Sequence, residues 1–185
     1  LWSRGLGDVY KRQLLSSIYY QRSGIYYGSK ISDLDQLIKR FEAGRPDVST
    51  LRNFSYDIQP PFQQSQHFTV KGEVKWRIND DHQLDIVGSF QENLRQEFEN
   101  RKKQQWSWIP MQDLILKTYK LDVTWNAKWH LWNMTTESGL ANSYQENFNY
   151  PGTKQPAFVP NFAALSMGGF LLHKAQWGKL QAALG

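Results

Sequence analysis

Hydrophobic and polar positions alternate most regularly over residues 66–98. Apolar side chains there fall on one parity and polar or charged ones on the other, with a polar turn at residues 79–82 between two runs. The apolar parity holds Phe68, Val70, Val74, Trp76, Ile78, Leu84, Ile86 and Phe90. Because successive side chains of a strand point to opposite faces, the pattern predicts a long β-hairpin with one apolar and one charged face.

This hairpin differs from an ordinary soluble one in two ways. Its strands reach or exceed about ten residues, whereas strands average about five or six. Its polar face is densely charged, which suits a water-filled lumen better than a solvated surface. A soluble sandwich alternates as well, so it is strand length and charge that suggest a transmembrane β-barrel. The residues expected to face the lumen are Lys71, Glu73, Lys75, Arg77, Asp85 and Asp122.

The rest of the chain continues the pattern. Further strands are predicted at residues 14–27, 113–127, 131–145, 163–176 and 179–185, which makes about seven in all. Long connections at 28–65, 99–112 and 147–162 alternate with tight turns near 79–82, 126–130 and 178. Outer-membrane barrels have this asymmetry, with long extracellular loops and short periplasmic turns. The predicted fold is therefore all-β, a partial antiparallel transmembrane barrel with long extracellular loops.

One of these loops contains a short helix. Ser32 and Asp35 form a capping-box pattern, a helical stripe follows, and Gly44 with Pro46 ends it. The stripe consists of Leu34, Leu37, Ile38 and Phe41. We expect it to be buried against the barrel rim or against Phe54 and Tyr56, as a packing element without a ligand role.

Tryptophan gathers near the predicted tight turns. The five residues concerned are Trp76, Trp125, Trp129, Trp132 and Trp177. Any one of them could be a core residue, but five beside the same class of turn favour an aromatic girdle at a membrane interface.

The composition excludes several classes of protein and of metal site. The chain has 22 Lys and Arg against 17 Asp and Glu, a net charge of +5, and no cysteine. It therefore has neither a disulfide framework nor a thiolate metal site. No apolar run approaches the roughly 18 residues of a membrane helix, and no signal peptide is visible at the start.

We interpret the N-terminal segment of the chain as foreign to the protein. Residues 3–13 resemble the in-frame translation of a transposase sequencing adapter, so we assign residues 1–13 to an adapter-derived artefact. The gene would then begin upstream. Residues 14–185 are expected to be a fragment that is incomplete at both ends.

No arrangement of residues indicates an enzyme. The histidines lack partners at metal-ligand spacing, and no phosphate loop or nucleophile elbow is present. We expect no catalytic residue, no cofactor and no metal site. A basic cluster next to Trp106 and Trp108 could suggest nucleic-acid binding, but one cluster in one loop is thin support. In an outer loop it could equally hold an anionic chelate, contact lipopolysaccharide phosphates or simply be solvated. We expect no nucleic-acid partner.

Several segments resemble TonB-dependent outer-membrane receptors, especially those of bacteroidetes. The matching pieces are Ile31-Ser32-Asp33-Leu34, Phe54-Ser55-Tyr56-Asp57-Ile58, Pro61 before Gln66-His67, Asp113-Leu114-Ile115-Leu116-Lys117-Thr118, Tyr144-Gln145-Glu146-Asn147, Pro151-Gly152-Thr153 and Phe158-Val159-Pro160-Asn161-Phe162. Their order and spacing resemble the middle of the family's barrel across nearly all of residues 14–185.

The resemblance implies a barrel of roughly 22 strands with a plugged lumen. It implies an outer-membrane receptor of a Gram-negative bacterium that imports a scarce nutrient. A ferric siderophore or similar iron complex is the favoured nutrient, and haem, cobalamin and glycans are the other nutrients that such receptors import. Its partners would be TonB and the inner-membrane energising complex, outer-membrane lipid and lipopolysaccharide. The ligand-contact candidates are Trp106, Trp108, Tyr150, Phe158, Arg101 and Lys102. The alternatives are a passive porin and, less favoured, a secreted all-β glycan-binding module.

Overall fold

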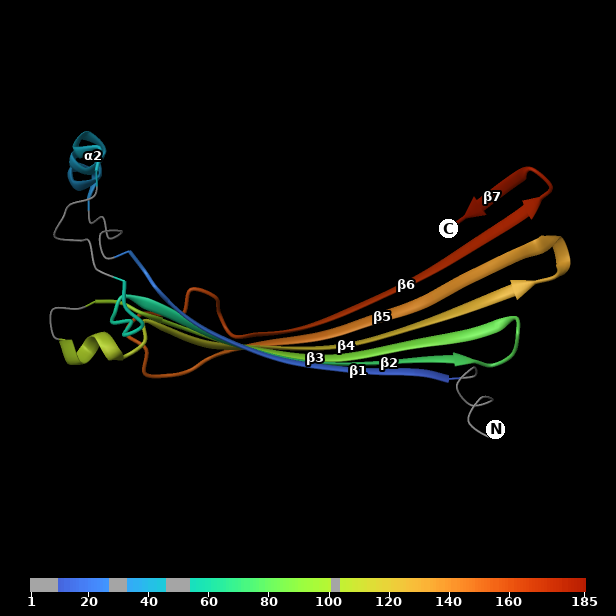
Figure 1. The fold of residues 1–185 in the computed structure, drawn as a ribbon, viewed down its shortest axis with the longest axis horizontal. Coiled ribbons are helices and arrows are strands. Elements are labelled where there is room, and N and C mark those ends of the chain that lie inside the picture. The colour runs from blue at the N-terminus through green and yellow to red at the C-terminus, as the bar shows by residue number, and fades with distance from the viewer. Residues whose placement is uncertain (1–9, 27–32, 46–53, 101–103) are drawn as a thin grey trace.

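Seven strands form a single open sheet in which every neighbouring pair is antiparallel and the spatial order follows the chain order (Figure 1). The computed structural model describes residues 10–26, 33–45, 54–100 and 104–185. The strands are β1 (Tyr10–Gly24), β2 (Phe62–Arg77), β3 (His82–Phe98), β4 (Gln112–Trp129), β5 (Met134–Asn149), β6 (Phe162–Trp177) and β7 (Leu180–Leu184). The helices are α2 (Leu34–Ala43) and the 3₁₀ turns η3 (Gln104–Trp108) and η4 (Leu131–Asn133). The all-β prediction is confirmed.

The predicted hairpin is β2 and β3, paired without interruption from Phe62↔Phe98 to Arg77↔Gln83. β2 begins at Phe62, before the predicted start at residue 66, and His82 belongs to β3 rather than to the turn. Strands β1 to β6 are each 15 to 18 residues long, about three times the average strand. The unusual strand length predicted from the sequence is confirmed.

The connections after β1, β3 and β5 are longer than those after β2, β4 and β6; that the longer ones are extracellular loops stays a prediction. All long connections lie at one end of the strands and all tight turns at the other (Figure 1). The turn predicted at 126–130 is wrong, because β4 continues to Trp129 and pairs there with Met134. The reversal is made instead by η4, where Asn133 has a left-handed φ of 44°, a conformation that asparagine tolerates better than most residues. β1 also differs: it runs from Tyr10 to Gly24, so it starts within the segment attributed to the adapter. That attribution stays a prediction.

The predicted loop helix is α2. Its N-cap is Asp33, whose carboxylate accepts from the Gln36 amide at 2.8 Å; Ser32 lies outside the described residues. Gly44 ends the helix in the left-handed conformation, as predicted. The expected burial of its stripe is wrong: Leu34 is 67% exposed, Phe41 80% and Phe54 85%. Figure 1 shows the reason, since α2 projects away from the sheet.

The sheet has no second layer among the described residues. Its only buried hydrophobic side chains there are Phe62, Phe98 and Ala127. Many large apolar side chains are exposed, for example Leu14, Met167 and Leu184. A single sheet with a broad exposed apolar face is not a stable unit in water.

Within the described ranges, no helix is both long enough and apolar enough to cross a membrane.

An aromatic cluster lies at the end of the sheet that carries the long connections. Phe62 stacks on Phe98 with ring centroids 4.4 Å apart, and Trp108 lies 5.8 Å from Phe62. The Arg22 guanidinium sits 3.9 Å above the Phe62 ring, a favourable cation–π geometry. These contacts hold η3 against β1–β3.

Candidate functional site

The continuous register assigns every strand residue to one of two faces. We call the face that carries Val74, Ile86, Val123, Leu140 and Gly169 the apolar face; these five residues form one cross-strand row. We call the other the polar face. Its matching row holds Glu73, Val87, Asp122, Ala141 and Gly168.

Aromatic side chains border the apolar face on the side of the tight turns. Trp76, Trp125, Trp129 and Trp177 all have the parity of this face, each near the turn end of its strand. His82 stacks on Trp125 with an interplanar angle of 6°, and the Trp129 indole N–H donates to Thr136 Oγ1 at 2.8 Å. These four tryptophans therefore lie on one face near the tight turns, and the membrane-interface girdle stays a prediction. The side chain of Trp132 lies outside the described set.

A second aromatic row crosses the apolar face nearer to the long connections. Phe90, Tyr119 and Tyr144 are cross-strand neighbours. Their ring centroids are 5.0 Å and 6.1 Å apart, and Phe68 extends the row. Beyond this row the apolar face becomes charged, beginning with the cross-strand trio Glu92, Lys117 and Glu146. The apolar face is thus a band with an aromatic border on both sides.

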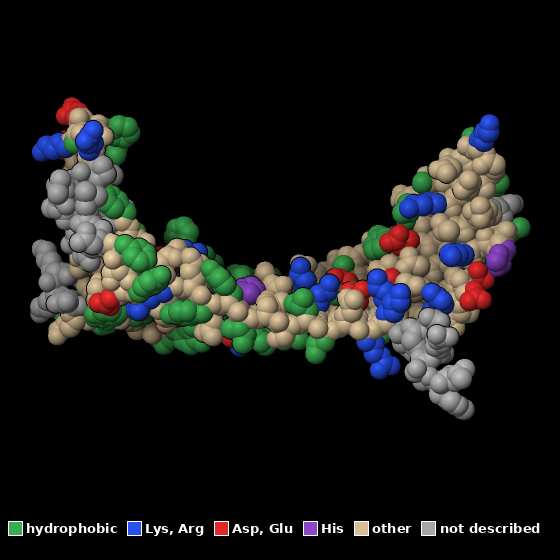
Figure 2. Space-filling model, in the orientation of Figure 1, with side chains coloured by type: hydrophobic (Ala, Val, Ile, Leu, Met, Phe, Trp, Pro, Cys, Tyr) green, Lys and Arg blue, Asp and Glu red, His purple; other side chains and the backbone are tan. Residues whose placement is uncertain are grey.

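The polar face is charged in the half that carries the tight turns (Figure 2). All six residues predicted to face the lumen lie on it: Lys71, Glu73, Lys75, Arg77, Asp85 and Asp122. Glu73 pairs with Lys75 at 3.2 Å and with Lys71 at 3.8 Å. Asp85 accepts from Gln83 at 2.7 Å and from Asn126 at 3.3 Å. The expected ion pairs are therefore present around Glu73.

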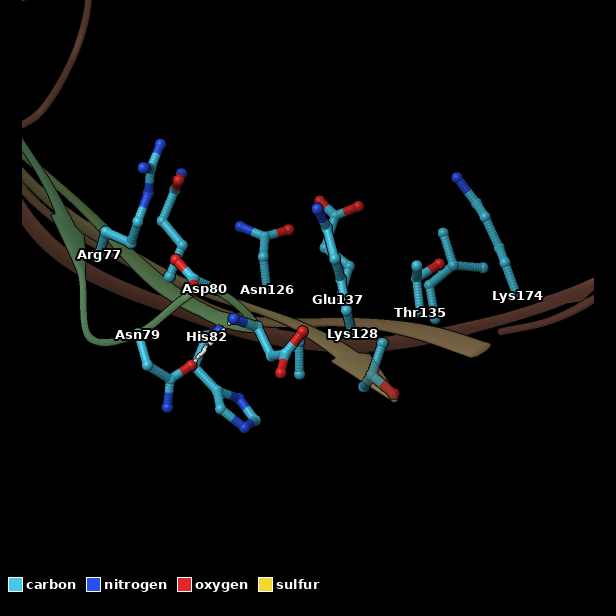
Figure 3. Close-up of a pocket in the computed structure, with 14 residues that line it drawn as sticks. Arg77, Asn79, Asp80, His82, Asn126, Lys128, Thr135, Glu137 and Lys174 are labelled. Atoms are coloured by element: carbon cyan, nitrogen blue, oxygen red, sulfur yellow. Dashed lines mark hydrogen bonds between the residues drawn. The ribbon is translucent and has the colours of Figure 1, made fainter. Parts of the chain in front are cut away.

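A cavity of about 470 Å³ opens at the turn end of this charged half. Its charged lining comes from four strands and one turn, and includes Arg77, Lys128, Glu137 and Lys174. Arg77, Asn126 and Lys174 point to one side of the sheet, whereas His82 points to the other (Figure 3). The lining carries both signs of charge and few apolar side chains. It therefore differs from the mostly apolar pockets that bind small molecules.

The other half of the polar face is rich in amides and hydroxyls. On β1–β3 it holds a second cavity of about 220 Å³, lined by Gln21, Ser23, Gln63, Gln64, Ser65, Asn93 and Arg95. This region is not predicted by any local sequence pattern, because its residues come from three different strands. A partial signal is the run of Gln and Ser at alternate positions of β1 and β2.

One strand breaks the polar pattern. On the polar face β6 presents Gly168, Phe170 and Leu172 in succession. The Phe170 ring lies so close over Gly139 that a Cβ there would be 2.4 Å from it. These three β6 residues form an apolar strip on the polar face.

The four aromatic ligand candidates do not form one site. Trp108 belongs to the Phe62 cluster on the apolar-face side. Trp106 is 41% exposed and lies 5.2 Å from the Lys154 ammonium, which joins the second long connection to the third. Tyr150 contacts Phe148 edge to face at 5.3 Å. Phe158 is 85% exposed. Arg101 and Lys102 lie outside the described residues.

The third long connection is closed at its base by two asparagines. Asn149 donates its amide to the Val159 carbonyl at 2.8 Å, and its backbone N–H donates to Asn161 Oδ1 at 2.7 Å. Asn147, which is buried, donates to the Pro160 carbonyl at 3.0 Å. These bonds hold the stems of the connection together, so that Tyr150 and Phe158 are carried on one closed loop.

Within the described ranges no cluster of three or more His, Cys, Asp or Glu side chains could hold a metal ion. No protein-family model matches the chain, and neither a curated protein nor a solved structure matches it.

Proposed function

We propose that the chain is part of a TonB-dependent receptor in the outer membrane of a Gram-negative bacterium, which imports a scarce nutrient by active transport. The sheet would be an arc of a transmembrane barrel, with the apolar face toward lipid and the polar face toward the lumen. The tight turns would be periplasmic and the long connections extracellular.

The observation that carries this proposal is the aromatic-bordered band. Tyr119 and Trp129, at its two borders, are about ten residues apart in β4, which is about 34 Å along a strand. At the tilt of roughly 40° usual in such barrels, this spans about 26 Å of thickness, close to the ~25 Å apolar band of outer-membrane proteins. A soluble sheet has no reason to keep aromatic side chains in two rows at this separation.

Charged side chains are nearly absent from the apolar face between the two aromatic borders. Among the described residues of the apolar face, Arg12 is the one charged side chain in the rows between the two aromatic borders, in register with Val74 and Ile86. Arg12 falls in the segment that we attribute to the adapter. A membrane protein would avoid an arginine at this depth, so its position supports the adapter interpretation.

The polar face supports a plugged lumen over an open pore. Its charged half suits a hydrated interior, but the strip around Phe170 and Leu172 would face water in a porin. A folded plug domain inside the barrel would cover it. We therefore favour a receptor energised by TonB over a passive porin, with Lys71, Arg77, Asp85 and their neighbours contacting the plug.

Ligand capture would fall to the long connections and the lumenal surface below them. Trp106, beside Lys154, and the closed loop that carries Tyr150 and Phe158 are the parts best placed to meet a ligand from outside. The family resemblance puts an iron complex first. Trp108 is better explained as the anchor of its own connection, because it packs on Phe62.

The proposal predicts how residues 14–185 behave when isolated. In plain buffer the chain should aggregate or remain without a cooperative unfolding transition, because its edges β1 and β7 and its apolar face have no partners. Circular dichroism with urea titration, in buffer and in detergent micelles, checks this. A soluble, cooperatively folding monomer in buffer would overturn the barrel.

A further inference from the structure

Three neighbouring strands are joined near the tight turns by a chain of side-chain hydrogen bonds. The Trp129 indole N–H donates to Thr136 Oγ1 at 2.8 Å, and Thr136 Oγ1 lies 2.9 Å from His173 Nδ1. The three residues come from β4, β5 and β6 in turn. Thr136 is 4% exposed, so its hydroxyl depends on these two neighbours for hydrogen bonding. We call the three residues the Trp129 relay.

The direction of each bond in the relay follows from the chemistry of the groups. An indole N–H can only donate, so Thr136 Oγ1 accepts from Trp129. The hydroxyl hydrogen of Thr136 then has His173 Nδ1 as its acceptor among the described residues. An imidazole nitrogen that accepts a hydrogen bond carries no hydrogen, so we assign His173 as neutral, with its hydrogen on Nε2.

A proton taken from solvent at Nδ1 would reverse the second bond. His173 would become a donor, and Thr136 Oγ1 would receive two donors while its own hydrogen had no acceptor among the described residues. Leaving a buried hydroxyl hydrogen without an acceptor costs free energy. The bond to Trp129 would weaken as well, because two donors would compete for one oxygen.

The surroundings of His173 offer no compensation for a positive charge. Its cross-strand row on the apolar face consists of His82, Ala127, Thr136, His173 and Leu184. No described residue of this row, or of the rows on either side of it on that face, has a carboxylate. The charged side chains of β4, β5 and β6 at this level lie on the polar face; they are Lys128, Glu137 and Lys174. His130, which precedes η4, pairs with Asp81 at 3.0 Å.

We propose that the Trp129 relay is a pH-sensitive junction, which holds β4, β5 and β6 together while His173 is neutral and loosens when acid protonates this residue. Its stabilising effect is therefore present at neutral pH and is lost as the pH falls. The junction lies within one sheet, so the inference requires neither a membrane nor a transported nutrient. In the orientation proposed above, it would lie at the periplasmic border of the band.

The test follows Trp129 in the complete protein, purified in detergent micelles and labelled with 5-fluorotryptophan. The fluorine-19 NMR signal of Trp129 is assigned by its loss in Trp129→Phe. We expect this signal to shift between about pH 7.5 and about pH 5. It should stay in place in His173→Gln, because a glutamine oxygen can accept from Thr136 at either pH. His82→Gln is the matched control, the same substitution in the same row, at a ring whose Nδ1 has no described partner, and it should keep the shift.

Urea unfolding of the same proteins gives a second measurement. Between the two pH values, the unfolding equilibrium constant of the unsubstituted protein should rise about fivefold more than that of His173→Gln. Thr136→Val removes the central hydroxyl, should lose the same excess, and takes the place of His173→Gln if that variant does not fold. A Trp129 signal that does not move with pH, that still moves in His173→Gln or Thr136→Val, or that His82→Gln holds in place equally, overturns the junction. Equal pH dependence of unfolding in the unsubstituted and relay variants overturns it too.

Discussion

An Ile86→Arg substitution should destabilise the protein in a membrane by about 2–4 kcal/mol, whereas Val87→Arg should leave its stability nearly unchanged. The two residues are adjacent, both β-branched and both partly buried, but they lie on opposite faces of β3. Ile86 is in the middle of the band between Val74 and Val123. If the apolar face meets lipid as proposed, an arginine there would be held in hydrocarbon.

An arginine at position 87 would instead lie on the polar face, among charged side chains. Val87 lies between Glu73 and Asp122 in the cross-strand register, so an arginine there can pair with two carboxylates facing water. The measurement is a urea titration of the complete protein folded into phospholipid vesicles. Equal effects of the two substitutions would mean that both faces meet the same solvent, which would contradict a lipid-facing apolar face.

Phe170→Arg should open the barrel to molecules that it normally excludes. The Phe170 ring lies on the polar face over Gly139, within the apolar strip of β6. If a plug domain packs on that strip, an unpaired charge introduced there disfavours the plugged state, and we expect the population of displaced plugs to rise roughly tenfold or more. Sensitivity of cells to a large hydrophilic antibiotic, together with single-channel conductance, measures this.

Ser166→Arg is the control for that experiment. It places the same charge on the same face of β6, beside Ser143 in a polar row and outside the strip. It should leave permeability as in the unsubstituted protein. A large conductance before any substitution, or equal conductance changes for both variants, would favour the passive porin instead.

The strands and their faces could be predicted because the relevant physics is local. Alternation in residues 66–98 reports directly which side chains share a face, and the register across β2–β4 keeps that assignment for Lys71, Asp85 and Asp122. The border near the tight turns also follows, since its tryptophans are placed by their distance from the turns, whereas the row of Phe90, Tyr119 and Tyr144 was not predicted. The end of β4 could not be predicted, because Asn126 to Trp129 is polar enough for a turn but pairs with β5.

The candidate site was less accessible to sequence analysis. Gln21, Gln63 and Asn93 meet only because three strands align, and no local pattern joins them. The packing of Trp108 on Phe62 is tertiary in the same sense. The periodicity of the apolar stripe correctly predicts the helix α2. Periodicity alone does not determine whether another element covers the stripe, so its exposure could not be predicted.

The most direct test of the central claim is to sequence the complete gene that contains this chain in its source. A TonB-dependent receptor predicts an upstream plug domain with a TonB-contacting segment, and further strands of the same alternation on both sides, toward a total of roughly 22. It also predicts that the residues preceding Leu14 differ from the adapter-like segment and place an uncharged residue where Arg12 stands. A signal peptide that leads straight into strands, with no plug domain, would contradict active import, and a reading frame that encodes only this sheet would contradict the barrel.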